Sequence, residues 1–269
     1  FRRHVLRGHA QLGIAAGDGL HPVAGFDAGQ RVEGVAGQPG GQRLRAQGGG
    51  VDPGASGASG TLEKDVVLKA AEALKAELET RADYQVVLVR DDDNFITLKD
   101  RVRAGRAAKA DLFISLHADS VSDASVHGAS VYTLSETASD SVAAELERSE
   151  NAADIISGVD LSGNDEVGTI LIDLAQRETK NRSSTFAQLL LPQLERQTGL
   201  ISKPHRFAGF RVLKAPDVPS VLIELGFLSN DTDESRLTSP KWRASTAAAI
   251  ARAVDGYYER MSSVAETGH

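Results

Sequence analysis

The sequence predicts an α/β fold, in which one domain contains a mainly parallel, twisted sheet with helices on both faces. Runs of β-branched and aromatic residues alternate along the chain with stretches in which apolar residues recur every three to four positions. The run LFISL is apolar and too short for a helix, as expected for a buried strand. With 269 residues, the chain is long enough for one sizeable α/β domain or two small ones.

The first half of the periodic region predicts two helices and three strands. A helix is expected over residues 65–79, where apolar residues share one face. The alternating run YQVVLVR, residues 84–90, predicts a strand. A basic helix should begin near Thr97, and strands should follow at residues 112–116 and 128–134. Strands that alternate with helices in this way favour parallel pairing.

The second half is more helical. An acidic helix is predicted over residues 139–157, followed by a long helical segment over residues 165–199. Two short strands are expected at residues 211–214 and 218–222. The last helix should begin at Pro240, because proline suits the first position of a helix.

Composition excludes several classes of function. The formal net charge is −7, so the chain lacks the basic character of a nucleic-acid-binding protein. It has no cysteine, which excludes disulfides, thiol nucleophiles and cysteine metal sites. No apolar run approaches the roughly 20 residues that a transmembrane helix needs. Because the chain begins with Phe1, we expect it to be a fragment that has lost any export signal.

Residues 1–48 differ in character from the rest of the chain. Residues 1–50 hold 13 of the 26 glycines and no lysine, and no apolar period persists there. One interpretation is a flexible linker or tail, and the other is a non-native sequence from GC-rich DNA translated in a wrong frame. The predicted organisation is therefore an atypical or disordered segment over 1–48, a folded domain over 49–262 and a tail over 263–269.

Three polar residues occupy positions where α/β proteins gather functional side chains, beyond the carboxyl ends of strands. His117 ends the strand LFISLH, Glu224 follows the strand VPSVLIE, and Glu63 opens the first helix after the loop DPGASGASG. Each has a structural alternative: a hydrogen-bonded histidine, a salt bridge from Glu224 to Arg101 or Arg211, and an acid that stabilises a helix N-terminus. Together, one nitrogen and two carboxylates at one edge suit zinc-assisted hydrolysis.

Three motifs carry a family resemblance. The chain resembles the zinc-dependent N-acetylmuramoyl-L-alanine amidases of bacterial cell-wall remodelling in three motifs that occur in the same order. These motifs are GGGVDPGASGASGTLEKD, ADLFISLHADS and VPSVLIELGFLSN. The resemblance implies that residues 49–262 form a catalytic domain in which Glu63 and His117 bind zinc and Glu224 is catalytic. It also implies an exported or periplasmic enzyme that cleaves the amide between N-acetylmuramic acid and L-alanine in peptidoglycan.

One departure from the family pattern concerns the metal. The family's first zinc histidine lies between glycines in D-x-G-H-G-G, and this position holds Gly48. The spacing of His4, His9 and His21 marks none of them as a substitute. We therefore expect impaired activity, and a non-catalytic peptidoglycan-binding or regulatory domain of the same fold is the alternative. A different zinc peptidase or deacylase is a further rival.

The acidic helix has two interpretations. Glu147, Glu150 and Asp154 share one face, which is typical of a solvated surface. The segment ERSENAAD also resembles the inserted helix of division-type amidases, whose glutamate covers the zinc until a coiled-coil activator displaces it. The resemblance implies an autoinhibitory insert over about residues 136–200 and makes Glu150 the candidate masking carboxylate.

Overall fold

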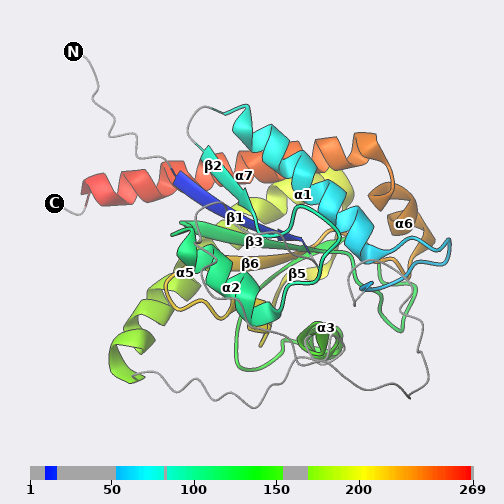
Figure 1. Cartoon of the computed structure of the whole chain (residues 1–269), viewed down its shortest axis with the longest axis horizontal. Helices are drawn as coiled ribbons and strands as arrows, with labels where there is room; N and C mark the ends of the chain where they lie inside the picture. Colours follow the sequence, from blue (N-terminus) through cyan, green and yellow to red (C-terminus); the bar gives the residue numbers. More distant parts are fainter. Residues whose placement is uncertain (1–9, 17–52, 82–83, 154–168, 268–269) are drawn as a thin grey trace, which may run out of the picture.

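The computed structural model describes residues 10–16, 53–81, 84–153 and 169–267 (Figure 1). In these residues, six strands form one sheet in the order β2-β1-β3-β6-β4-β5. The strands are β1 Ala10–Ala16, β2 Tyr84–Leu88, β3 Leu112–His117, β4 Ala129–Leu134, β5 Leu200–Ala208 and β6 Ser220–Glu224. The helices are α1 Glu63–Glu79, α2 Leu98–Ala107, α3 Ser141–Asn151, α5 Thr169–Thr198, the 3-10 turn η1 Arg211–Leu213, α6 Asp231–Leu237 and α7 Pro240–Thr267.

The predicted α/β class and the mainly parallel sheet are confirmed. Neighbouring strands pair in parallel from β2 to β6 and again between β4 and β5, whereas β4 and β6 pair antiparallel. The carboxyl ends of β3 and β6 therefore meet at one edge of the sheet, as in other parallel α/β folds.

Apolar residues form a layer on each face of the sheet. On one face, α1, α5 and α7 pack over a core that includes Val67, Leu74, Leu190 and Ile250. On the other face, α2, α3 and η1 cover a second core that includes Leu98, Leu146 and Val212. Figure 1 shows α1 and α7 on one side of the strands and α2 and α3 on the other. Among the described residues, no helix combines the length and hydropathy needed to cross a membrane.

One predicted strand was wrong, and the strand near it in the chain was missed. Residues 211–214 do not form a strand, because Arg211–Leu213 is a 3-10 turn. The strand in that part of the chain is β5, Leu200–Ala208, which lies at the edge of the sheet. Its polar side chains and Pro204 obscured the pattern, and both are tolerated at an edge strand that leaves one side unpaired.

The strand β1 was not expected either. It comes from the segment 1–48, in which we found no lasting apolar period, yet Ala10–Ala16 pairs with both β2 and β3. Seven residues of the atypical segment thus lie inside the sheet. The domain boundary at residue 49 and the non-native origin of residues 1–48 stay predictions.

Candidate metal centre

The paired ends of β3 and β6 bring two candidate residues together. His117 is the last residue of β3, Glu224 is the last of β6, and the two are register partners in the parallel pair. Both are buried, with 1% and 0% of their surface exposed. The predicted convergence of these residues therefore follows from strand pairing alone.

Glu63 reaches the same edge from the start of α1. Its Oε1 accepts a hydrogen bond from the Ala118 backbone N–H at 3.1 Å, and its Oε2 accepts one from Ala55 N–H at 2.9 Å. Gly54 has φ +66°, and a Cβ there would stand 2.7 Å from Glu63 Oε2. The glycine-containing loop thus packs closely around the Glu63 carboxylate. It holds this carboxylate next to Ala118, the residue that follows His117.

The His117 ring is oriented by a hydrogen bond on one nitrogen. Nε2 lies 2.8 Å from Ser115 Oγ, whereas Nδ1 makes no hydrogen bond within the described residues. Nδ1 instead lies 3.3 Å from Glu63 Oε1 and 3.2 Å from Glu150 Oε2. A ring held through one nitrogen and surrounded by carboxylates at the other is typical of a metal-binding histidine.

The distances fit a small divalent cation. One ligand atom each from Glu63, His117 and Glu150 lies within 4.8 Å of the others. Tetrahedral zinc with bonds of about 2.0–2.2 Å places neighbouring ligand atoms roughly 3.3–3.6 Å apart, close to the two observed distances. The imidazole and carboxylate donors also suit zinc, so the residues present fit the metal.

Glu224 lies beside this cluster. Its Oε2 accepts a hydrogen bond from the Asp119 backbone N–H at 3.2 Å, and its Oε1 is buried without a partner among the described residues. The alternative of a salt bridge to Arg101 or Arg211 receives no support from the contacts of Glu224. Arg101 donates instead to the Ile96 carbonyl at 2.9 Å. The free Oε1 leaves Glu224 able to accept a proton.

Asp119 was missed by the sequence analysis. It is 4% exposed, its Oδ1 accepts from Ser120 N–H, and its Oδ2 is buried without a partner in the described part of the chain. The signal was present in the sequence, because Asp119 follows His117 by two residues at the carboxyl end of a buried strand. The site thus holds a fourth carboxyl group.

The remaining metal candidates cannot be placed. Gly48, the position of the family's first zinc histidine, lies outside the described residues, and so do His4, His9 and His21. Asp154, the third acid of the predicted face, also lies outside them.

Comparison with known proteins identifies the family. The N-acetylmuramoyl-L-alanine amidase profile matches residues 44–256, which is more than half of the chain. The chain belongs to this family. It is 42% identical over 210 residues to the amidase AmiC of Neisseria meningitidis serogroup B, covering 78% of this chain and 50% of AmiC. It is 38% identical over 212 residues to AmiA of Escherichia coli, covering 78% of this chain and 73% of AmiA.

Solved structures of the amidase family share the fold. The amidase AmiC2 of Nostoc punctiforme aligns with a TM-score of 0.61 at 24% identity, covering 94% of this chain and 98% of that one. Ami1 of Mycobacterium smegmatis aligns with a TM-score of 0.62 at 18% identity, over 94% and 99% of the two chains. The chain spans about half the length of the two AmiC proteins it matches, 50% and 53%.

The buried charges of this amidase-family chain shift one another's pKa values. Burial raises the pKa of Asp119 to about 9, helped by the carboxylates of Glu63, Glu150 and Glu224. Burial also raises the pKa of Glu224 to about 8, against the lowering effect of His117. An excess of buried acids over bases without a metal thus favours proton binding in the folded state.

His117 and Glu63 shift in opposite directions. Burial alone would lower the pKa of His117, but the carboxylates of Glu150 and Glu63 outweigh it and raise the pKa well above 6.5. Burial would raise the pKa of Glu63, but the neighbouring His117 and the backbone N–H groups of Ala55 and Ala118 lower it. The positive charge of protonated His117 thus balances the surrounding carboxylates in the metal-free site, as a bound cation would.

These shifts predict that the metal-free protein loses stability as pH rises from about 5 to about 9. Asp119, Glu224 and His117 have raised pKa values in the folded state, so the folded chain binds more protons than the unfolded chain in this window. Glu63 is ionised in both states there and adds no slope. Urea unfolding with a chelator, repeated at several pH values, measures the trend.

Two aspartate variants control this measurement. Asp119→Asn removes one raised group and should flatten the decline, whereas Asp123→Asn, at a fully exposed carboxylate with a lowered pKa, should leave it unchanged. A free energy of unfolding that stays constant or increases up to pH 9 would contradict the prediction.

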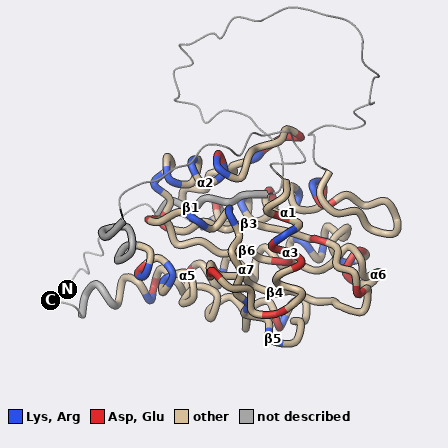
Figure 2. Tube along the Cα trace, turned by 90° about the horizontal axis from the view of Figure 1, so that it is seen from below, with Lys and Arg blue, Asp and Glu red and all other residues tan. Residues whose placement is uncertain are grey.

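The basic helix interacts mostly with its surroundings. Figure 2 shows several Lys and Arg positions along α2. Arg101 is 2% exposed, Arg106 pairs with Asp217 at 2.7 Å, and Arg103 pairs with Asp100 at 2.5 Å. The basic character of the helix predicted near Thr97 is thus partly neutralised by neighbouring acids.

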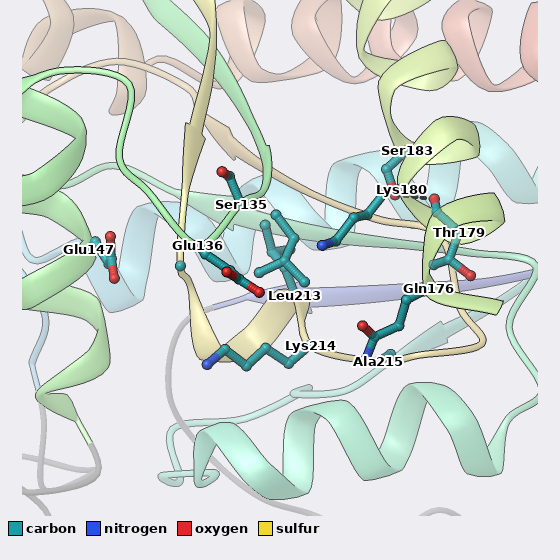
Figure 3. Close-up of a pocket in the computed structure, with 12 residues that line it drawn as sticks. Ser135, Glu136, Glu147, Gln176, Thr179, Lys180, Ser183, Leu213, Lys214 and Ala215 are labelled. Atoms are coloured by element: carbon teal, nitrogen blue, oxygen red, sulfur yellow. Dashed lines mark hydrogen bonds between the residues drawn. The ribbon is translucent and has the colours of Figure 1, made fainter. Parts of the chain in front are cut away.

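A cavity of about 480 Å³ lies away from the metal cluster. It opens between the end of β4, α3, η1 and α5, and its lining includes Glu136, Glu147, Lys180 and Lys214 (Figure 3). None of Glu63, His117, Glu150 and Glu224 lines it. Helix α3 contributes Glu147 to this cavity and Glu150 to the metal cluster, so a movement of α3 would change both the cavity and the cluster.

Proposed function

We propose that this domain catalyses zinc-dependent hydrolysis of the amide bond between N-acetylmuramic acid and L-alanine in peptidoglycan. The observation that carries the proposal is the cluster of Glu63, His117 and Glu150 with Glu224 beside it. Family membership supports the reaction class, and the names of the curated relatives support the substrate.

The roles of the side chains follow from their geometry. Glu63 and His117 hold the metal through Oε1 and Nδ1, which Ala118 N–H and Ser115 Oγ orient. Bound zinc supplies a Lewis acid that polarises the scissile carbonyl and lowers the pKa of water toward ~7. Glu224, through its unpartnered Oε1, removes the proton of the attacking water and returns it to the leaving amine of alanine.

Glu150 has a regulatory role in this proposal. Its Oε2 stands 3.2 Å from His117 Nδ1, which suits a carboxylate that takes a metal position needed by water. The protein is then an exported cell-wall amidase, held inactive until a coiled-coil partner withdraws α3 during daughter-cell separation. The geometry of Glu150 supports masking, and the resemblance alone suggests the partner.

The alternative is a peptidoglycan-binding or regulatory domain that keeps the fold without catalysis. One observation favours it, namely Gly48 at the position of the first zinc histidine. Glu63, His117 and Glu224 around one site favour the enzyme, because a binding domain needs no buried base beside a metal cluster.

The proposal predicts a specific product. Incubation of the protein with purified peptidoglycan and zinc should release stem peptides with a free N-terminal alanine, slowly in the chain as given. His117→Ala should abolish both the release and zinc binding, because it removes the nitrogen ligand of the described cluster. His127 is exposed and its Nδ1 bonds the Ser125 carbonyl outside the metal cluster, so a His127→Ala control should change neither.

Other outcomes separate the rival functions. Peptides cut within the stem, or released acyl groups, would indicate a different zinc peptidase or deacylase. Binding to peptidoglycan without any release, in a variant shown to hold zinc, would favour the non-catalytic domain.

A further inference from the structure

Helix α3 is anchored at its start by the strand that precedes η1. The N-cap Asp140 accepts from Ala143 N–H at 2.9 Å and from Arg206 Nη1 at 2.7 Å. The neighbouring backbone adds a hydrogen bond from Ser139 N–H to the Phe207 carbonyl at 2.9 Å. Arg206 is 8% exposed, whereas the Asp140 side chain is 36% exposed, so this anchor is shielded from water on the Arg206 side.

The Asn151 side chain links the end of α3 to the turn between β5 and η1. Asn151 Nδ2 donates to the Gly209 carbonyl at 3.2 Å, and Asn151 Oδ1 accepts from Arg211 N–H at 2.8 Å. One amide thus satisfies a backbone acceptor and a backbone donor in the turn between β5 and η1. Asparagine is suited to this because its carboxamide carries a donor and an acceptor side by side.

Among the described residues, the last turn of α3 itself buries no apolar side chain, although Ala153 just beyond it is 7% exposed. Within α3, the buried side chains are Ala143 and Leu146, which lie in its first half and middle. Next to these two hydrogen bonds of Asn151, which we call the clamp, Glu147 and Gly209 line the 480 Å³ cavity. The last turn, which carries Glu150, is thus positioned by the hydrogen bonds of Asn151 next to the buried Ala153.

We propose that Asn151 is the positioning residue that keeps Glu150 against His117. The inference rests on the proposed masking role of Glu150 and adds the contact that sets it. Glu150 directly precedes Asn151, so the clamp fixes the turn from which the carboxylate reaches Nδ1 at 3.2 Å. When the clamp opens, α3 can move about its Asp140 anchor, and Glu150 leaves the metal cluster.

A double-mutant cycle on zinc affinity tests this role. Zn²⁺ is titrated against a competing chromophoric chelator with the full chain and with Glu150→Ala, Asn151→Ala and the double variant. Loss of two side-chain hydrogen bonds should weaken zinc binding by roughly 5- to 100-fold in Asn151→Ala. In the Glu150→Ala background, the same substitution should change zinc affinity less than about two-fold, because its effect passes through Glu150.

Hydrogen exchange provides an independent readout. Asn151→Ala should speed amide exchange in α3 about ten-fold or more, in both backgrounds, and leave β3 unchanged. Asn181→Ala on the exposed surface of α5 is the matched control and should change neither measurement, because the hydrogen bond from Thr185 Oγ1 goes to the Asn181 backbone carbonyl, which alanine keeps.

The possible failures are distinguishable. If Glu150→Ala leaves zinc affinity unchanged, Glu150 is no ligand and the proposed masking fails. If Glu150→Ala weakens binding but Asn151→Ala does not, or if Asn151→Ala acts equally in both backgrounds, the positioning role of Asn151 is overturned while masking stands.

Discussion

Gly48→His should tighten zinc binding by at least about a hundred-fold and raise amidase activity by a similar factor. The resemblance implies a zinc histidine at this position, which holds Gly48 here, and within the described residues His117 is the nitrogen ligand of the metal cluster. Loss of a partner outside the ligand shell already costs about 10- to 100-fold in metal affinity or activity, so a missing ligand should cost more. Chelator competition and release of alanine-terminated peptides measure the two effects.

A neighbouring substitution provides the control for this prediction. Gly49→His adds the same imidazole one residue further along the loop, where the family pattern has glycine, and should restore neither property. A second design replaces residues 1–48 with the corresponding segment of the Neisseria meningitidis relative. If this exchange leaves zinc affinity and activity unchanged, the interpretation that this segment carries the defect is wrong.

Glu224→Gln should lower kcat about 10²- to 10⁴-fold in a protein that contains Gly48→His. Glutamine keeps an acceptor for Asp119 N–H but cannot take the proton of water, so the chemical step loses its general base. Zinc affinity should change little, because Glu224 is not among the three residues of the metal cluster. Steady-state kinetics and zinc titration of the same preparation separate the two effects.

Glu136→Gln is the matched control, because Glu136 lines the separate cavity and is exposed. Its kcat should equal that of the parent protein. A Glu224→Gln variant with full activity and normal zinc content would exclude Glu224 as the base and direct attention to Asp119, the neighbouring carboxyl group.

The sequence predicted the parts of the site that belong to regular elements. His117 and Glu224 end runs of buried β-type residues, and neighbouring parallel strands place such ends together. Glu63 is the first residue of a helix that follows a glycine-containing loop. This loop contacts the Glu63 carboxylate through Ala55 N–H and Gly54, as expected for a side chain held in a fixed position. These residues could be identified because strand and helix periodicity places them without knowledge of distant contacts.

Edge strands and turns were harder to predict. The β5 segment carries exposed Ser202 and Lys203 and half-buried Pro204, so its residue pattern does not predict a strand. Its extended structure depends on pairing with β4. The strand β1 lies in a region without apolar periodicity and is defined by its neighbours β2 and β3. In both cases, pairing partners far away in sequence overrode weak local preference.

The sequence by itself determined the α/β class, the order of most elements and the three residues at the strand and helix ends. The resemblance to division-type amidases singled out Glu150, whereas only the tertiary structure decided how it meets His117 and that Asn151 clamps the end of α3 to the turn after β5. The physical reason is that periodicity fixes which face of an element is apolar. It does not fix where a polar residue 33 positions away from His117 will come to lie, because that depends on how a helix with two buried side chains docks.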